Sequence, residues 1–333
     1  MSDTSKDPYQ VVGIGNAIVD VLAQTDDSFL DHMGIEKGIM QLVERPRAEM
    51  LYAAMSDRVQ APGGSVANTL AGLGELGLRC AFIGRVKDDT LGRFYAQGME
   101  AEGTAFPNPP QQVEAPTSRS MIFVTPDGER SMNTYLGAGA DLGPEDVPEA
   151  VFAQVGLLFL EGYLFDKVPG KAAFEAAARY ARGAGGHAGI TLSDPFCVDR
   201  HRADFQRLVA DELNFVIGNE HEYMALYETE DLGAALARAA SVCELVVCTR
   251  SGDPVVMIRG DARVEVPVTR VVPVDATGAG DQFAAGFLYG LATGKSLEVC
   301  GRMGVIAGSE VISHFGARPK TDVRARFVAE GLL

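Results

Sequence analysis

The chain has 333 residues, of which 47% are hydrophobic, and a formal net charge of −16 at pH 7. This length suits one large α/β domain or two domains, and the mean hydropathy of +0.05 is too low for a membrane protein. The acidic charge argues against a nucleic-acid surface, which needs clustered lysine and arginine. Five scattered cysteines without a C-x-x-C pair favour reduced thiols over a disulfide scaffold or a zinc site.

The N-terminal residues and the length of the apolar runs indicate where in the cell the protein is located. The first ten residues, MSDTSKDPYQ, lack the charged and then apolar pattern of an export signal. No run reaches the roughly 20 apolar residues of a membrane-spanning helix. We therefore expect a cytoplasmic protein with no membrane partner.

Strand and helix patterns alternate along the first half of the chain. Two runs, 120–126 and 130–136, flank the turn residues Asp127 and Gly128 and predict a hairpin. The other expected elements are two strands joined by a loop over 11–23, a helix over 65–77, a strand over 80–86 and a helix over 89–103.

The second half predicts a parallel sheet. Its strands are nearly continuous apolar runs separated by helical patterns, which indicates a sheet covered on both faces. Ligands of such sheets bind at the carboxyl ends of the strands. The expected strands span 155–164, 189–196 and 214–222, with two more within 244–260, and the expected helices span 171–185 and 231–242 and begin near 279 and 297.

Four polar stretches stand beside these apolar elements. The last of them opens a helix, whose free backbone N–H groups can bind an anion. Each stretch alone has an ordinary interpretation as a strand end, a turn or a cap, but together they predict a polar rim at one sheet edge. The stretches are GNAIVD (15–20), APGGSVANT (61–69), GNEHE (218–222) and DATGAGD (275–281).

Other site classes fit the sequence less well. GIGNAI (13–18) has Ile18 where the third glycine of a dinucleotide-binding fingerprint would fall, and no P-loop motif is present. A Rossmann oxidoreductase would therefore have to show NAD(H) binding without its fingerprint. His221 lies between two glutamates, and a solvated side chain explains it better than a metal ligand does.

The polar stretches carry a resemblance to the ribokinase-type (PfkB) carbohydrate kinases over about residues 10–320. DATGAGD before an apolar helix is close to that family's D-T-x-G-A-G-D signature, GGSVANTLAGLGELG resembles its first signature, and GNEHE resembles its N-x-x-E motif. The resemblance implies a ribokinase-like three-layer α/β/α sandwich with a central, mostly parallel sheet and a small β-sheet lid. Residues 1–333 would form one domain, with the lid built from about 22–43 and 104–136.

Three further stretches resemble the adenosine-kinase branch of this family: GNAIVD, TLSDPF (191–196) and GERSMNTYLGA (128–138). The resemblance implies transfer of the γ-phosphoryl group of ATP to a primary hydroxyl of a nucleoside, with adenosine as the expected acceptor. A sugar kinase acting on ribose, fructose or 2-keto-3-deoxygluconate is the alternative. A non-catalytic nucleotide- or sugar-binding protein is a third reading, which the intact Gly278, Gly280 and Asp281 oppose. The expected state is a monomer or a homodimer.

The resemblance also implies a role for each site residue. Asp281 would accept the hydroxyl proton, and the helix N-terminus would keep its pKa low. The amides of Gly278, Ala279 and Gly280 would bind the phosphoryl oxygens, and Arg130 on the lid would neutralise developing charge. The acceptor would contact Asn16, Asp20, Gly63, Gly64, Ser65, Asn68 and Tyr163. ATP would lie along Asn219, Thr249, Gly252, Thr277, Gly278, Gly280 and Ser309. Mg²⁺ would be organised through water by Asn219 and Glu222, and K⁺ by Asp275 and Thr277.

Overall fold

A nine-stranded sheet forms the centre of the protein in the computed structural model, which describes residues 8–333. Residues 1–7, which make up most of the N-terminal stretch MSDTSKDPYQ, lie outside the described residues. The strands are, in sheet order, β14 (Ala262–Val266), β13 (Asp253–Arg259), β12 (Leu245–Arg250), β11 (Phe215–Asn219), β10 (His187–Thr191), β9 (Leu157–Glu161), β1 (Val11–Ile14), β5 (Cys80–Ile83) and β6 (Thr104–Ala105). Strands β12 to β6 run parallel, whereas β13 and β14 are antiparallel.

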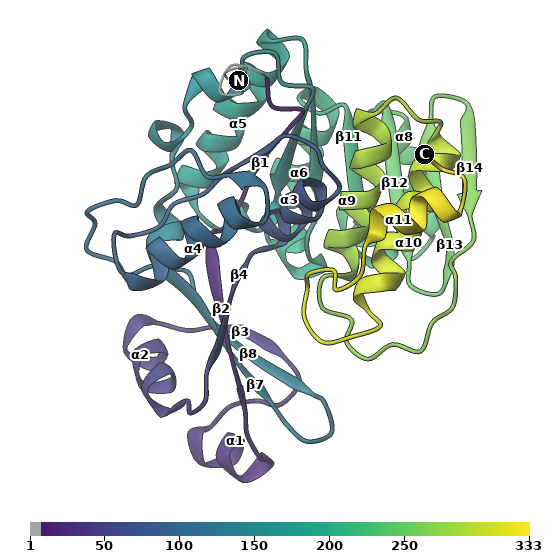
Figure 1. The fold of residues 1–333 in the computed structure, drawn as a ribbon. Helices are drawn as coiled ribbons and strands as arrows, with labels where there is room; N and C mark the ends of the chain where they lie inside the picture. Colours follow the sequence, from purple (N-terminus) through teal and green to yellow (C-terminus); the bar gives the residue numbers. More distant parts are fainter. Residues whose placement is uncertain (1–7) are drawn as a thin grey trace.

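Helices cover both faces of this sheet, which confirms the predicted three-layer sandwich (Figure 1). One face packs against α3 (Ser65–Glu75), α4 (Thr90–Ala101), α9 (Ala279–Ala292), α10 (Leu297–Val311) and α11 (Val323–Ala329). The other packs against α5 (Val168–Gly183), α6 (Pro195–Asp211), α7 (Glu220–Tyr227) and α8 (Leu232–Ala240).

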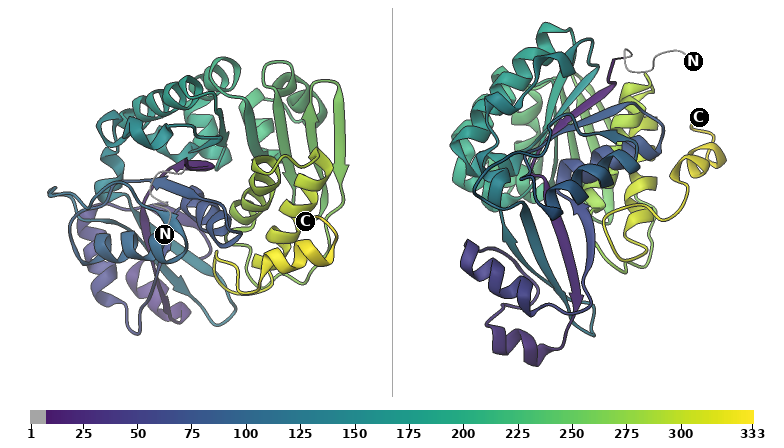
Figure 2. Two further views of the ribbon diagram at one scale, coloured as in Figure 1. Left: turned by 45° about the horizontal axis from the view of Figure 1, so that its top comes forward. Right: turned by 60° about the vertical axis from the view of Figure 1, so that its left-hand side comes forward.

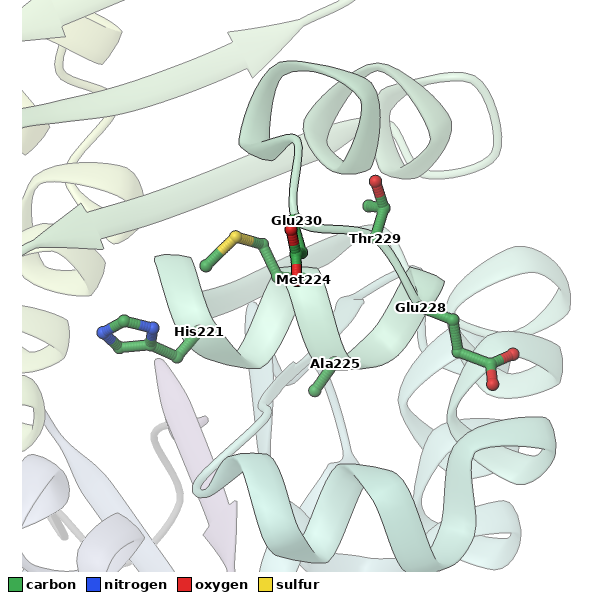
Figure 3. Close-up of a pocket in the computed structure, with 6 residues that line it drawn as sticks. All are labelled: His221, Met224, Ala225, Glu228, Thr229 and Glu230. Carbon is green, nitrogen blue, oxygen red and sulfur yellow. The ribbon is translucent and has the colours of Figure 1, made fainter.

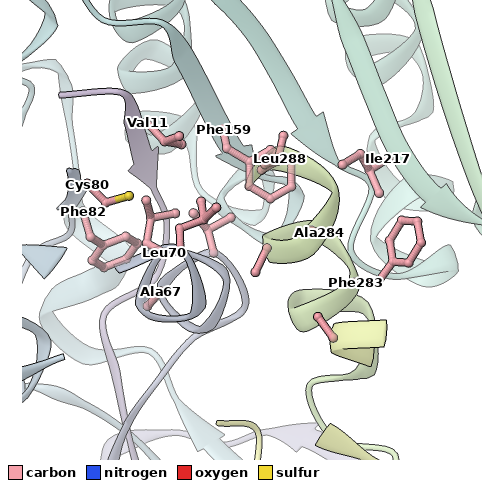
Figure 4. Close-up of a cluster of buried hydrophobic side chains, with 14 of the residues drawn as sticks. Val11, Ala67, Leu70, Cys80, Phe82, Phe159, Ile217, Phe283, Ala284 and Leu288 are labelled. Atoms are coloured by element: carbon pink, nitrogen blue, oxygen red, sulfur yellow. The ribbon is translucent and has the colours of Figure 1, made fainter. Parts of the chain in front are cut away.

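Strand residues alternate between the two hydrophobic cores. Val11 and Phe159 join the cluster around α3 and α9, whereas their neighbours Val12 and Leu158 face the helices on the opposite side. Figure 4 shows Val11, Leu70, Phe159 and Leu288 of the first cluster. Every residue of β1, β5 and β9 is buried, which explains why these strands read as unbroken apolar runs.

A second, five-stranded sheet projects from the layered part (Figures 1 and 2). Its order is β3 (Met40–Leu42), β8 (Arg130–Tyr135), β7 (Ser118–Val124), β2 (Ile18–Gln24) and β4 (Val59–Gly63). Strands β7 and β8 form the predicted hairpin, with Val124 opposite Arg130. Helices α1 (Asp27–Met33) and α2 (Arg45–Ala54) accompany this sheet.

The expected extent of the small sheet, about 22–43 and 104–136, needs correction. The sheet already begins at Ile18 and includes β4, whereas Thr104 and Ala105 pair with β5 in the main sheet. Strand β4 contains Pro62 and ends in glycine, a composition typical of a loop. Proline is tolerated in β4 because this strand lies at the edge of the sheet.

Two predicted strands are too long because a helix cap follows each of them. The run 189–196 leaves the sheet after Thr191, and the Asp194 side chain accepts hydrogen bonds from Phe196 N and Cys197 N to begin α6. The run 214–222 leaves it after Asn219, whose side chain caps α7. Asp and Asn cap helices by satisfying free N–H groups of the first turn. Helices α1, α2, α6, α7 and α11 and strand β14 were not predicted from the sequence.

Two composition-based expectations can be compared with the structure. Within residues 8–333, no helix is long and apolar enough to cross a membrane. All five cysteines are buried free thiols, as their scattered positions predict.

Candidate active site

A cavity of about 1070 Å³ lies between the small sheet and the carboxyl ends of the main-sheet strands. Its walls come from β2, β3, β7 and β8 on one side, and from the ends of β9 to β12 with the starts of α3 and α9 on the other. The sequence-predicted residues that line it are Asn16, Asp20, Gly64, Ser65, Asn68, Tyr163, Asn219, Glu222, Thr249, Thr277, Gly278, Ala279, Gly280 and Asp281.

Five predicted residues are not part of the cavity wall. Gly63, Arg130 and Asp275 lie directly behind it, in contact with residues that line it or with each other. Gly252 is exposed at the turn between β12 and β13, and the Ser309 hydroxyl donates to Thr269 O at 3.4 Å. The structure therefore brings DATGAGD together with GNAIVD and APGGSVANT around the cavity. Gly252 and Ser309 lie outside the cavity wall.

The start of α9 depends on glycine. Gly278 is the N-cap with φ of +77°, and a Cβ there would lie 2.7 Å from Ala317 Cα. Such a left-handed conformation favours glycine. The first turn of a helix leaves N–H groups without intrahelical partners, although the Ala279 N–H already donates to Ala276 O at 3.2 Å. The turn thus offers backbone donors and a partial positive charge to the cavity.

The Asp281 carboxylate is held in place by two side chains from α3. Ser65 Oγ donates to Asp281 Oδ1 at 2.6 Å, and Asn68 Nδ2 donates to Asp281 Oδ2 at 2.8 Å. Burial raises the pKa of Asp281 above its usual value, against the lowering effect of these hydrogen bonds and of Arg318. The expectation of a low pKa was wrong, because desolvation outweighs the helix N-terminus. A raised pKa makes this carboxylate a better proton acceptor.

Asp20 presents a free carboxylate to the cavity. Among the described residues, no side chain or backbone group donates a hydrogen bond to it. Burial raises its pKa to about 7, and the charges of Arg318 and Arg130 oppose that rise. A Cβ at Gly63 would lie 2.4 Å from Asp20 Oδ2, so only glycine leaves room for this carboxylate. Asp20 is therefore available to accept hydrogen bonds from a ligand.

Glu161 is a site residue that motif reading missed. Its Oε1 accepts from Asn16 Nδ2 at 2.8 Å and from Asn16 N at 3.2 Å, and its Oε2 accepts from Val66 N at 3.0 Å. Glu161 is only 1% exposed, and burial raises its pKa to about 7 despite these donors. A glutamate closing the apolar strand LLFLE was the available signal. Glu161 connects the β1–β2 loop to the start of α3.

We expect Glu161 to make stability depend on pH. The native state binds its proton more tightly than the unfolded state does, so stability falls as pH rises from about 4.5 to about 7. The contribution of this one group is on the order of 3 kcal/mol. Unfolding of E161Q by urea should show a shallower fall over this range than the wild type, whereas the exposed control E36Q should keep the wild-type slope. An unchanged slope in E161Q would contradict the buried carboxylate as its source.

Arg130 connects the small sheet to the DATGAGD stretch. Its Nη2 lies 2.5 Å from Asp275 Oδ2, and its Nη1 lies 3.4 Å from Thr277 Oγ1. Asp275 also accepts hydrogen bonds from Thr277 Oγ1 at 2.7 Å and from Gly316 N at 2.8 Å. The carboxylate proposed for K⁺ is thus already neutralised by a guanidinium in this conformation.

Asn219 and Glu222 form a reciprocal cap at the start of α7. Asn219 N and Nδ2 donate to the two carboxylate oxygens of Glu222 at 2.8 and 2.7 Å, and Glu222 N donates back to Asn219 Oδ1. Glu222 is 5% exposed, and burial raises its pKa to about 7. Thr249 lies opposite Asn219 on the neighbouring strand. Both oxygens of Glu222 are engaged, which suits a metal held through water.

A shallow pocket on α7 lies apart from this cavity. It is lined by His221, Met224, Ala225, Glu228, Thr229 and Glu230 (Figure 3). His221 is exposed, as predicted for a solvated side chain. Across residues 8–333, no group of three or more His, Cys, Asp or Glu side chains is placed to hold a metal ion.

The fold and the site together define a class of enzyme. A covered parallel sheet, a glycine-rich helix start and buried carboxylates around one cavity are the features of a phosphotransferase that acts on an alcohol group. The chain belongs to the pfkB family of carbohydrate kinases, whose model matches residues 38–324. Kinases of this family act on nucleosides or sugars and use ATP with a divalent metal.

Known proteins similar to this chain include both kinds of kinase. The adenosine kinase from Sinorhizobium meliloti is 46% identical, with 97% of this chain and 100% of that chain covered and a TM-score of 0.90. A probable sugar kinase protein from Rhizobium etli CFN 42 is 43% identical, with 98% and 99% covered and a TM-score of 0.90. The aminoimidazole riboside kinase of Salmonella typhimurium is 29% identical over 248 residues, which cover 70% of this chain and 74% of that protein.

Proposed function

We propose that the protein transfers the γ-phosphoryl group of ATP to a primary hydroxyl of adenosine. The observation that carries the proposal is the Asp281 carboxylate, held by Ser65 and Asn68 where the free N–H groups of α9 meet the cavity. Asp281 accepts the hydroxyl proton, and the attacking oxygen forms its bond to phosphorus as the bond to the ADP oxygen breaks. Similarity to the S. meliloti adenosine kinase supports adenosine as the acceptor.

Positive charge for the transferred group comes from local sources. The protein carries a net charge of −16, so an anion needs donors placed within the site. The amides of Gly278 and Gly280, with the partial charge of the α9 N-terminus, supply them, and the Ala279 amide joins them once it leaves Ala276 O. Arg130 reaches this loop from the small sheet, which acts as a lid and excludes water from the reacting phosphoryl group.

The acceptor binds between Asp20 and the apolar wall of the small sheet. The free Asp20 carboxylate accepts hydrogen bonds from two ribose hydroxyls, and Asn16, Gly63 and Gly64 shape the space beside it. An apolar wall suits a purine ring, and the volume of about 1070 Å³ lies at the upper end of ligand pockets, which suits two ligands. The wall comprises Ile18, Ile39, Met40, Leu42, Met132 and Leu136, with Tyr163 opposite in the lining.

One observation favours a sugar kinase as the second candidate. Asp20 and Glu161 both line the cavity, and two carboxylates suit an acceptor with many hydroxyl groups. The R. etli probable sugar kinase protein has the same fold as this chain. Glu161 already accepts three hydrogen bonds from Asn16 and Val66, which leaves Asp20 as the freer acceptor.

ADP release from MgATP tests the two candidates directly. The panel of acceptors contains adenosine, other nucleosides, ribose, fructose and 2-keto-3-deoxygluconate. We expect a strong response to adenosine alone. A sugar response would keep the chemistry and overturn the acceptor, and silence from folded protein that binds ATP would favour a non-catalytic binder.

Mg²⁺ fits the residues at the start of α7. Mg²⁺ keeps several of its waters in protein sites, and the capped Glu222 carboxylate can order those waters beside Asn219. The bound ion would neutralise phosphate charge. We expect E222Q to raise the Mg²⁺ concentration for half-maximal rate about tenfold. The control E220Q alters a neighbouring, more exposed carboxylate near Arg250 and should leave that concentration unchanged.

K⁺ is proposed to bind at Asp275 and Thr277. Asp275 pairs with Arg130 in this structure, so binding of K⁺ requires that ion pair to open. We expect faster turnover in K⁺ than in tetramethylammonium at equal ionic strength. Equal rates would remove K⁺ from the mechanism and leave Arg130 as the partner of Asp275.

A further inference from the structure

Arg318 is a half-buried cation that neither the motifs nor the cavity wall includes. It lies in the segment between α10 and α11, and its side chain is 17% exposed. Its Nη2 donates to Pro62 O at 3.0 Å and its Nη1 donates to Ala67 O at 3.2 Å. Glu102, the C-cap residue of α4, lies 3.0 Å from Nη1 and forms an ion pair with it.

The two carbonyl groups that Arg318 binds belong to consecutive elements beside the site, β4 and the start of α3. Pro62 precedes Gly63, which faces the Asp20 carboxylate. Ala67 lies in the first turn of α3, between Ser65 and Asn68, the two side chains that hold Asp281. One guanidinium therefore joins the strand beside the acceptor to the helix that orients the base.

A second contact connects the same segment to the start of α9. Gln282 is buried, and its Nε2 donates to Asn68 O at 3.0 Å and to Ala317 O at 3.1 Å. Ala317 also lies against Gly278. Residues 317 and 318 thus contact both elements that form the proposed phosphoryl-transfer centre.

Arg318 also faces an excess of negative charge. Its charge lowers the pKa of both Asp20 and Asp281, against the burial that raises them. Arg130, the other cation facing Asp20, is paired with Asp275. The ionisable groups around the two carboxylates are Glu161, Arg130 and Arg318, with the phenols of Tyr95 and Tyr163 and, beyond Arg318, Glu102 and Glu75.

We propose that Arg318 is a positioning residue for phosphoryl transfer, which fixes Asp281 relative to the acceptor site and offsets the charge of Asp20 and Asp281. This inference rests on the proposed function. Arg318 influences the reaction through its hydrogen bonds to Pro62 O and Ala67 O and through its positive charge. Loss of such alignment lowers a rate by about 10² for a displacement near 1 Å.

The test compares R318Q and R318K with R302Q, which removes an exposed ion pair on α10 and is the matched control. We expect R318Q to lower kcat/KM at pH 7 by about 10–100-fold. Without the cation, the pKa of each carboxylate rises, so the acidic limb of the kcat/KM profile moves to higher pH. R318K keeps the positive charge, so the acidic limb of its pH profile should return to the wild-type position. Its KM should stay above the wild-type value, because an ammonium group does not form both of the hydrogen bonds that the guanidinium forms.

A readout without turnover separates this inference from the proposed function. Carboxyl ¹³C NMR of the ligand-free enzyme, with the Asp281 signal assigned through D281N, should show a higher pKa in R318Q than in the wild type or R302Q. An active enzyme whose pH profile and Asp281 titration are unchanged in folded R318Q would overturn the inference and leave the proposed function standing. Should R318Q fail to fold, a displaced acidic limb in R318K would contradict the charge role, and a wild-type KM in R318K would contradict the positioning role.

Discussion

We expect D281N to lower kcat by about 10²–10⁴-fold, the range that a positioned general base contributes. Asparagine keeps the shape of the side chain at the start of α9 but cannot accept the hydroxyl proton. The backbone carbonyl of residue 281 still accepts from Thr69 Oγ1, so the helix start should remain in place. The measurement is steady-state ADP release, with ATP binding followed by calorimetry in parallel.

The same substitution should not weaken the fold at neutral pH. Burial raises the pKa of Asp281, so an ionised carboxylate there lowers native-state stability above its unfolded pKa. D281N therefore keeps a Tm at pH 7.5 at least equal to that of the wild type. S65A, which removes one hydrogen bond to the carboxylate, is the matched control and should lose less activity. Turnover near the wild-type rate in D281N would rule out Asp281 as the base.

We expect D20A to raise the KM for the acceptor by about 10²-fold, because a hydrogen bond to a charged group contributes roughly 1.5–3 kcal/mol. The Asp20 carboxylate has no protein donor, so the ligand hydroxyls are its natural partners. Most of kcat should survive at saturating acceptor, since Asp281 and the α9 amides remain in place. Initial rates at varied adenosine concentration measure both constants.

The control for D20A is D31A, which removes an exposed carboxylate from α1 of the same small sheet region. D31A should keep the wild-type KM. An unchanged KM in D20A would show that the acceptor does not use this carboxylate. A fall in kcat without a change in KM would instead show that Asp20 stabilises the transition state and not the bound acceptor.

The sequence predicts the sandwich and the place of the site well, for a physical reason. Strands buried on both faces must be apolar throughout, so polar residues appear only where a strand ends, and parallel strands bring those ends to one edge. Asn16 and Asn219 follow this rule and line the cavity. Glu161 follows it too, but it lies outside the four polar stretches, and its role comes from its contacts with Asn16 and Val66.

Other features of the fold and of the site depend on contacts between residues that are far apart in the sequence. Strand β4 reads as a loop because Pro62 and Gly63 suit turns, and only pairing with β2 makes it a strand. The pKa of Asp281 follows from desolvation by surrounding elements, which a helix-start motif does not reveal. Arg318 lies more than 250 residues from Pro62 and Ala67 along the chain, so no local pattern connects them.

Product identification tests the central claim most directly. Wild-type protein and D281N would each be incubated with MgATP and adenosine. The nucleotides would then be separated, identified and quantified by mass spectrometry. The proposed function predicts AMP and ADP in equal amounts from the wild type and neither above background from D281N. ADP without AMP, or AMP formed equally well by D281N, would contradict an adenosine kinase that uses Asp281 as its base.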